Sequence, residues 1–235
     1  MRLGLFSDSH YCRSLVSCGS RRPSLSLGKI REAMEAFQRE QVDLCICLGD
    51  LADQGKTPEE PLECLQEALE VIRSYGIPYR IIAGNHDYAV FTGAEFSAHT
   101  GCPETPCVMD TERHTLIFLD ANYRSDYRRF DVAGVEWTDS NLPPKQLDFL
   151  RDALAASEKP CVVLIHENLD NTVEARHIVK NADEARKIIE ESGKVQLVLQ
   201  GHYHWGADSM INGIRYLTLA AMCEGEKNSY LILDI

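Results

Sequence analysis

Side chains that can bind metal ions recur along this chain, each directly after a short apolar run. The clearest case is VQLVLQGHYHWG, residues 195–206, in which the apolar run ends in Gly-His-Tyr-His. Four other runs also end in carboxylate, amide or imidazole side chains, and glycine stands beside several of them. Because glycine lacks a Cβ, it lets the backbone approach such a site closely. The five groups are Ser7-Asp8-Ser9-His10, Gly49-Asp50, Gly84-Asn85-His86-Asp87, His166 and Gly201-His202-Tyr203-His204.

Taken singly, these groups are weak signals. An isolated buried histidine is more often a hydrogen-bonded core residue than a ligand, and Gly-Asp after a strand is usually a turn. The set is more specific, because five of the eight histidines fall within it. His99, His114 and His177 fall elsewhere, and we interpret them as structural. Carboxylate, amide and neutral imidazole together suit Mn, Fe or Zn rather than a soft thiolate site.

The elements that must position these groups are strands covered on both faces. The apolar runs are nearly continuous rather than alternating, as expected of such strands, and helix-period segments lie between several of them. Ser26 is the expected N-cap of the first helix, and the tail predicts a hairpin about Asn212-Gly213 followed by a last strand. We expect a mixed α/β sandwich with ligands bound outside the carboxyl ends of its strands. The expected strands are 3–7, 43–49, 79–84, 115–120, 161–166 and 195–200, and the expected helices are 26–40, 58–75, 143–155 and 182–192.

No repeat, low-complexity tract or linker divides the chain, so we expect one domain over residues 1–235. Two segments, 11–25 and 122–142, fit no element. Loops of that length are usually functional or mobile. The alternative is a surface insertion without a role.

Composition limits the classes of protein to consider. An apolar fraction of 44% and a charged fraction of 26% are typical of a soluble globular protein, and no apolar run approaches the roughly 18 residues of a membrane span. The apolar part of MRLGLFSDSH is too short for a signal peptide, so we expect the cytoplasm. In that compartment the nine cysteines are expected to be reduced, although spacing allows pairs at Cys12/Cys18 and Cys102/Cys107. The formal charge of −12 opposes binding to duplex nucleic acid, although SRRPS and YRRF could form a local basic patch.

The order of the motifs resembles a known family. D-x-H, G-D, G-N-H-D, a lone H after a strand and then G-H-x-H look like the signature of the calcineurin-like metallophosphoesterases. In this sequence they are Asp8/His10, Asp50, Asn85/His86, His166 and His202/His204, with no substitution. The motifs span residues 8 to 204, so the resemblance covers most of the chain. It implies a sandwich of two mixed β-sheets flanked by helices.

The resemblance also implies a cofactor of two divalent or mixed-valence metal ions (Mn, Fe or Zn). Seven protein groups are too many for one open catalytic ion and about right for two that share a carboxylate. Two ions roughly 3.5–4 Å apart can lower the pKa of a bridging water from 15.7 to about 7, so a metal-bridging hydroxide is the expected nucleophile. The implied ligands are Asp8, His10 and His204 on the first ion, Asn85, His166 and His202 on the second, and Asp50 on both.

His86 remains outside this ligand set. The resemblance places it at the substrate oxygens, where it would stabilise developing charge or protonate the leaving group. Asp87 could orient it, or could be a helix N-cap or turn residue. Other residues could also serve the substrate: Tyr11, Tyr88, Asn168 and Trp205 adjoin the motifs, and Arg13, Arg21 and Arg22 could hold a second phosphate or be ordinary surface charges.

The expected substrate is a small phosphodiester or nucleotide-type phosphoester. The acidic charge favours a small substrate, and residues 26–53 resemble the early part of bacterial phosphodiesterase-like members. A phosphomonoesterase and a nucleoside-diphosphate pyrophosphohydrolase are the alternatives. A non-catalytic metal-binding scaffold is an alternative of another class, disfavoured because a scaffold has no need of His86. We expect no membrane partner, and the sequence indicates no oligomeric state.

Overall fold

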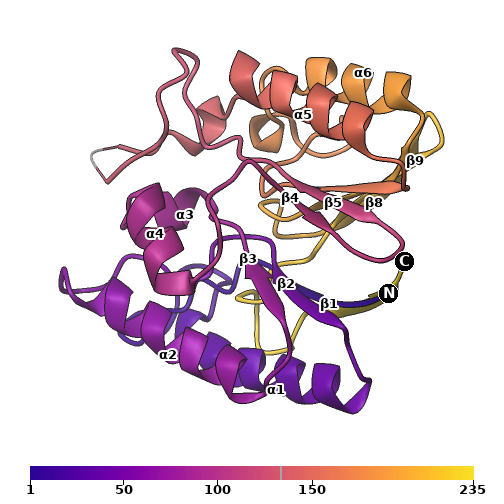
Figure 1. Cartoon of the computed structure of the whole chain (residues 1–235). Helices are drawn as coiled ribbons and strands as arrows, with labels where there is room; N and C mark the ends of the chain where they lie inside the picture. The colour runs from indigo at the N-terminus through magenta and orange to yellow at the C-terminus, as the bar shows by residue number, and fades with distance from the viewer. Residues whose placement is uncertain (133) are drawn as a thin grey trace.

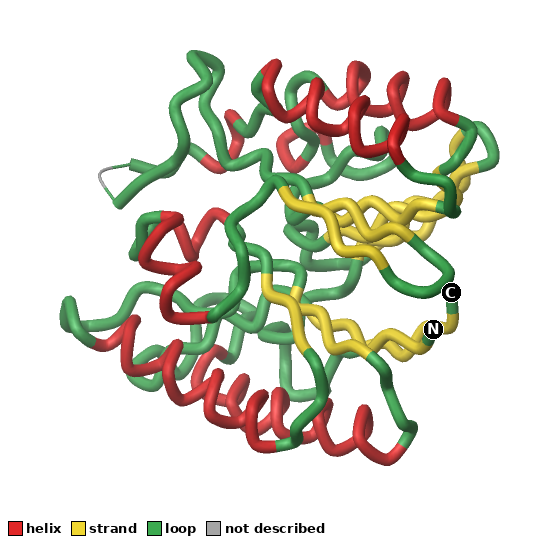
Figure 2. The backbone as a smooth tube through the Cα atoms, in the orientation of Figure 1, coloured by secondary structure: helices red, strands yellow, loops and turns green. Residues whose placement is uncertain are grey.

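Two β-sheets lie face to face, with helices on their outer faces (Figure 1, Figure 2). The computed structural model describes residues 1–132 and 134–235; residue 133, within the expected 122–142 loop, lies outside the described residues. One sheet has the strand order β10-β1-β2-β3 and the other β4-β5-β6-β7-β9-β8. Both are mixed, since β10, β4 and β8 run antiparallel to their neighbours. The strands are β1 (Arg2–Phe6), β2 (Leu44–Cys47), β3 (Tyr79–Ile81), β4 (Cys107–Asp110), β5 (Thr115–Phe118), β6 (Cys161–Leu164), β7 (Val195–Gln200), β8 (Ala207–Ile211), β9 (Ile214–Thr218) and β10 (Leu231–Asp234).

The helices divide between the two sheets. In Figure 1, α1 (Ser26–Arg39) and α2 (Glu60–Ser74) cover the four-stranded sheet, and α5 (Pro144–Ala156) and α6 (Ala182–Ser192) cover the six-stranded sheet. Two shorter helices lie to the left of the sheets in that view, away from the chain termini. These are α3 (Asn85–Tyr88) and α4 (Gly93–Thr100), and three 3₁₀ turns complete the set: η1 (Pro23–Leu25), η2 (Trp137–Asp139) and η3 (Ala175–His177).

Alternate residues of a strand enter different apolar layers. Leu44, Ile46 and Leu48 lie in the cluster between the sheets, whereas Cys45 and Cys47 lie in the cluster under α1 and α2. Both faces of the strand are therefore buried, which is why the sequence runs are continuously apolar.

The expected fold class is confirmed, and each of the four expected helices is present with ends within two residues. The hairpin is also confirmed, with φ of 51° at Asn212 and 82° at Gly213 between β8 and β9. One expectation needs correction. Ser26 is not the N-cap of α1: the turn η1 precedes the helix, Leu25 takes the cap position, and the Ser26 hydroxyl donates to the carbonyl of Ser9. The sequence pattern also missed α3, α4 and β4.

All nine cysteines are free thiols, so neither pairing allowed by spacing is present. Within the residues that the structure describes, none of the helices has the length and apolar character needed to span a bilayer.

Candidate metal centre

The residues expected to bind metal meet at one edge of the sandwich. Each follows a strand at its carboxyl end, where the side chains of neighbouring parallel strands converge. The four-stranded sheet supplies four of them and the six-stranded sheet three. They are Asp8 and His10 after β1, Asp50 after β2, Asn85 after β3, His166 after β6, and His202 and His204 after β7.

Asp50 lies between the two halves of this cluster. Its Oδ2 atom is 3.5 Å from Nε2 of His10 and 3.3 Å from Nε2 of His166. On the first side, Nε2 of His10 is 3.2 Å from Nε2 of His204, which is 3.5 Å from Oδ1 of Asp8. On the second side, ligand atoms of Asp50, His166 and His202 all lie within 4.8 Å of one another. One carboxylate thus faces two groups of ligand atoms.

Several buried polar atoms in the cluster lack a hydrogen bond. Burying such an atom without a partner costs free energy, so native structures rarely leave it unpaired. Carboxylate oxygen, amide oxygen and imidazole nitrogen are all ligand atoms, and their grouping fits cation binding. Within the described part of the chain, the atoms without a hydrogen-bond partner include Oδ1 of Asp8, Oδ1 of Asn85, Nε2 of His166 and Nε2 of His202.

Three of the side chains, His10, His202 and Asp50, favour protonation states that suit ligands. The pKa of His166 and of His204 is instead raised, despite burial, by the nearby carboxylates of Asp50 and Asp8 respectively. Burial, reinforced by the nearby His86, lowers the pKa of His10 to about 4, which keeps this imidazole neutral. Burial and the nearby His166 hold the pKa of His202 well below its usual value. Burial alone would raise the pKa of Asp50, but the surrounding imidazoles, His166 foremost, bring it well below its usual range. Neutral imidazoles and an ionised carboxylate are the forms that bind metal.

Hydrogen bonds at Nδ1 orient the imidazole rings. His166 Nδ1 lies 2.6 Å from the carbonyl oxygen of Leu48, and His204 Nδ1 lies 2.8 Å from Oε1 of Glu224. A partner at one ring nitrogen fixes both the tautomer and the direction of the other nitrogen. In both residues it is Nε2 that is left facing the cluster.

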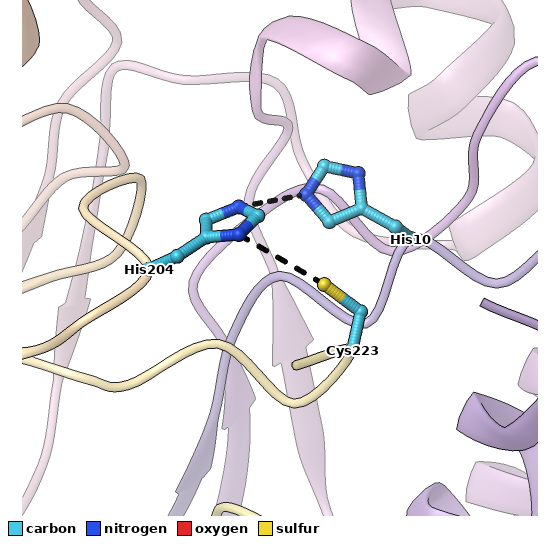
Figure 3. A group of neighbouring side chains, drawn as sticks. All are labelled: His10, His204 and Cys223. Carbon is cyan, nitrogen blue, oxygen red and sulfur yellow. Dashed lines mark hydrogen bonds between the residues drawn. The ribbon is translucent and has the colours of Figure 1, made fainter. Parts of the chain in front are cut away.

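Cys223 is a neighbour of His204 and could be considered as a further metal ligand. Figure 3 shows the His204 ring between His10 and Cys223, with the two contacts made by different ring nitrogens. The thiol is 4.0 Å from Nδ1, the nitrogen that faces Glu224, rather than from Nε2. Burial also raises the pKa of the Cys223 thiol, which disfavours the thiolate form that metals bind. The oxygen and nitrogen ligands are therefore the better candidate set.

The backbone is strained at the ligands themselves. Asp8, His10, Asp50 and His202 have φ values of 53°, 45°, 52° and 65°, a region that residues other than glycine seldom occupy. Next to Asn85, a Cβ added at Gly84 would lie 2.2 Å from Oδ1 of Asp50, so only glycine fits there. The strained backbone conformations and the close contact between Gly84 and Asp50 both lie where the ligand atoms converge.

Asp53, rather than Asp87, contacts His86. Oδ1 of Asp53 is 2.9 Å from Nδ1 of His86, and Oδ2 is 3.3 Å from Nδ1 of His10. The Asp87 carboxylate instead accepts hydrogen bonds from the backbone amides of Leu51, Ala52 and Gly84. The expectation that Asp87 orients His86 is therefore wrong, and its alternative role as a turn residue fits these contacts. The sequence signal for Asp53 is its position three residues after Asp50 in GDLAD.

A cavity of about 340 Å³ lies over the cluster. Its lining includes Asp50, Asn85, His86, His202 and His204. Both segments that fit no element contribute, because residues 18–21 and Trp137 line the same cavity. The lining also includes Arg176, His177, Tyr203, Trp205 and Glu224.

The structure separates the candidate substrate residues. Trp205 and Arg21 line the cavity, and so does His177, for which the sequence indicates only a structural role. No periodic pattern marks the segment around His177, so the sequence alone does not reveal its role. The remaining candidates form other contacts: Tyr11 with Glu67, Tyr88 with Asp120, Asn168 with Thr218, Arg13 with Glu63 and Glu67, and Arg22 with the carbonyls of Gly19 and Arg21.

Comparison with known proteins agrees with this geometry. The family model described as calcineurin-like phosphoesterase matches residues 1–206. The chain is 23% identical over 202 residues to a probable cyclic nucleotide phosphodiesterase of Psychrobacter arcticus, covering 80% of this chain and 67% of the relative. It is 28% identical over 205 residues to the 3',5'-cyclic adenosine monophosphate phosphodiesterase CpdA of Escherichia coli, covering 83% of this chain and 66% of the relative. The chain thus spans about two thirds of the length of these relatives.

Solved structures share the fold. A dimetal phosphatase from Danio rerio superposes with a TM-score of 0.81 at 14% identity, covering 99% of this chain and 91% of that one. A protein from Thermus thermophilus superposes with a TM-score of 0.60 at 10% identity, covering 94% and 89%. The family match covers most of the chain, and its motif residues converge in one cluster. The chain belongs to the calcineurin-like phosphoesterase family, a family of metal-dependent phosphoric ester hydrolases.

Proposed function

We propose that this chain is a binuclear-metal phosphoesterase that hydrolyses a small phosphodiester or nucleotide-type phosphoester. The observation that carries the proposal is the position of Asp50, whose Oδ2 lies 3.5 Å from Nε2 of His10 and 3.3 Å from Nε2 of His166. A carboxylate placed between two groups of ligand atoms suits a pair of ions. Two relatives, a probable cyclic nucleotide phosphodiesterase and the 3',5'-cyclic adenosine monophosphate phosphodiesterase CpdA, support the substrate class.

In this proposal the ligand atoms divide between two ions as the family resemblance implies. Mn, Fe and Zn all accept carboxylate, amide and imidazole ligands of this kind. Two such cations supply a Lewis acid for a phosphoryl oxygen and acidify a bound water. The residues that would hold them are Asp8, His10 and His204 for one, Asn85, His166 and His202 for the other, and Asp50 for both.

His86 supplies the acid function in this proposal. Burial lowers the pKa of His86, but the charges of Asp50 and Asp53 outweigh burial and raise it above the usual value. The Asp53 contact holds Nδ1 and leaves Nε2 for a substrate oxygen. A protonated His86 lining the cavity can stabilise negative charge on the phosphoryl group or protonate the leaving oxygen.

Metal analysis of two variants tests the ligand map. Wild-type protein reconstituted with Mn²⁺ should hold two ions per chain by elemental analysis. Asp50→Ala should lose more metal and more activity than Asn85→Ala, because Asp50 serves both ions and Asn85 serves one. One ion or fewer in the wild type, or equal losses in the two variants, would contradict the binuclear assignment.

A substrate panel tests the reaction. With Mn²⁺ added, the protein should hydrolyse bis-p-nitrophenyl phosphate, and cyclic nucleotides should be turned over faster than phosphomonoesters or nucleoside diphosphate derivatives. A preference for monoesters or diphosphates would favour the alternative phosphatase or pyrophosphohydrolase reactions. Metal binding without turnover of any member would favour the non-catalytic scaffold.

A further inference from the structure

The cavity over the candidate metal centre is large enough for a substrate with a sizeable organic group. Its volume is about 340 Å³, which falls at the lower end of the range of roughly 300–1,000 Å³ for small-molecule sites. The metal ligands occupy only part of its lining. The rest comes from residues 18–21, 86, 137, 176–177, 203, 205 and 224, so the cavity extends well beyond the reacting centre.

Both tryptophans of the chain line this cavity. Trp137 belongs to η2 and is half-buried, whereas Trp205 follows the ligand His204 and is 69% exposed. Indole rings are large apolar surfaces that folded proteins usually bury. Their placement at a cavity lined with charged and polar groups indicates a ligand that is partly planar and apolar.

Trp137 belongs to a group of contacting rings, here called the aromatic wall, that also contains His177, Tyr203 and the proposed ligand His202. The ring centroid of Trp137 lies 5.1 Å from that of His177 and 5.7 Å from that of His202. The Tyr203 ring contacts His177 edge-on at 5.2 Å. The wall combines η2, η3 and the loop after β7, so three separate segments fix its position next to the reacting centre.

Cationic side chains adjoin this wall. The guanidinium carbon of Arg176 lies 5.9 Å from the Trp137 centroid, and Arg21 lines the cavity as well. The chain as a whole is acidic, with a formal charge of −12, but this cavity contains two guanidinium groups. Arg favours phosphate groups and the faces of planar rings. The cavity therefore offers complementary partners for both halves of a nucleotide.

We propose that Trp137, supported by Arg176 and His177, is a stacking wall for the base of a nucleotide substrate. The proposal rests on the proposed function and narrows its substrate class to nucleoside phosphoesters. Stacking depends on the π-face that every base has, so it tolerates different bases. We therefore expect weak discrimination between purines and pyrimidines and strong discrimination against a phosphoester without a base.

Binding of two matched probes tests the wall without requiring turnover. The Mn²⁺-loaded protein is titrated by calorimetry with adenosine 5'-monophosphate and with ribose 5-phosphate, which share the phosphate and the sugar. The base should tighten binding by roughly 5- to 150-fold. Trp137→Leu should remove most of that difference and leave the affinity for ribose 5-phosphate unchanged, whereas Trp137→Phe should retain most of it.

Two further variants locate the effect. Tyr127→Leu replaces a 46% exposed aromatic in the same 122–142 segment and should behave as wild type. Because Trp205 is 69% exposed, Trp205→Leu should lose less of the preference for the base than Trp137→Leu does. The proposal fails if the wild type binds both probes equally, if Trp137→Leu retains the preference, or if only Trp205→Leu loses it.

The binding test and the substrate panel together distinguish failure of the stacking proposal from failure of the proposed hydrolysis. A protein that hydrolyses phosphodiesters but binds both probes equally has the proposed activity without the wall. A protein that prefers the nucleotide through Trp137 but hydrolyses none of the panel has the wall without the proposed activity.

Discussion

Asp53 contacts two histidines that have different tasks. Its two carboxylate oxygens lie 3.3 Å from Nδ1 of His10, a proposed ligand, and 2.9 Å from Nδ1 of His86, the proposed acid. A carboxylate behind a metal-binding histidine raises the basicity of the ring and fixes its orientation. One side chain thereby links the strength of metal binding to the protonation of His86.

Replacing Asp53 should affect both tasks. In Asp53→Asn the side chain keeps its shape and loses its charge, so we expect about 10- to 100-fold weaker Mn²⁺ binding together with lower turnover at saturating metal. Calorimetric titration and initial rates measure the two effects. Asp126→Asn, a change to a partly exposed carboxylate in the 122–142 segment, is the control. Unchanged metal affinity would show that Asp53 does not support His10.

Removing His86 should separate turnover from metal binding. We expect His86→Ala to retain both ions and to lose about 10²- to 10⁴-fold in kcat, the usual contribution of a general acid. The defect should be larger for a ribose ester than for a nitrophenyl ester, because an alkoxide leaving group needs a proton and a nitrophenolate does not. Elemental analysis and kcat for both esters check this.

Two other outcomes for His86→Ala are informative. Equal defects for both leaving groups, with metals intact, would assign His86 to charge stabilisation. Loss of metal would make His86 a ligand, consistent with its grouping within 4.8 Å of His10 and Asp50 ligand atoms.

Among the elements, the turn from β3 into α3 leaves no room for a side chain beside the site. Gly84 occupies this turn, and its backbone amide donates to Oδ2 of Asp87 at 2.9 Å. A methyl group here would lie 2.2 Å from Oδ1 and 2.7 Å from the backbone nitrogen of Asp50. The turn and the shared carboxylate therefore cannot both keep their positions if a side chain is added.

Gly84→Ala should consequently weaken metal binding and reduce stability. Gly28→Ala is a matched control within α1, because its added Cβ meets nothing within 4 Å. We expect that control to be neutral or to stabilise by about 0.5–1 kcal/mol, the usual advantage of alanine over glycine in a helix. Thermal unfolding with and without Mn²⁺ measures both variants. Wild-type metal affinity in Gly84→Ala would show that Asp50 can move without consequence.

The strands and the ligands that follow them can be predicted from the sequence, whereas the residues that reach the site from long connections cannot. The apolar runs predict the central strands because both faces of each strand are buried, and the ligands follow because each comes directly after its strand. Trp137 and His177 behave differently: they reach the cavity through 3₁₀ turns in long connections. The path of such a connection depends on contacts with distant segments, and no periodicity records it. Asp53 and Glu224 were missed for a related reason, since they act through the histidines that they orient.

At the scale of the whole molecule, the candidate metal centre joins the two sheets. Asp8, His10, Asp50 and Asn85 follow strands of one sheet, and His166, His202 and His204 follow strands of the other. Bound cations would therefore connect the two halves of the sandwich, and ligands that bind only the folded state stabilise it.

Removing metal should lower thermal stability. At a free Mn²⁺ concentration of about 100 times Kd, each bound ion contributes about 2.7 kcal/mol, which corresponds to a change in Tm of roughly 5–10 °C per ion for a chain of this size. Calorimetric melts after chelation, and after Mn²⁺ is restored at several concentrations, measure this. A Tm that does not change with metal would mean that the ligand cluster is already satisfied without a cation.

The apolar layer between the sheets has a consequence for the chemistry. Leu3, Leu5, Leu44 and Ile46 of one sheet pack there against Phe118, Val162 and Leu164 of the other. This layer sets how far the two sets of strand ends lie from one another, and so acts as a spacer for the ligand atoms. Densely packed interiors transmit strain rather than absorb it. Substitutions in this layer lie away from the substrate, yet they would change the distance between the two sets of ligands. Catalytic precision in the proposed enzyme would therefore also depend on the packing of its core.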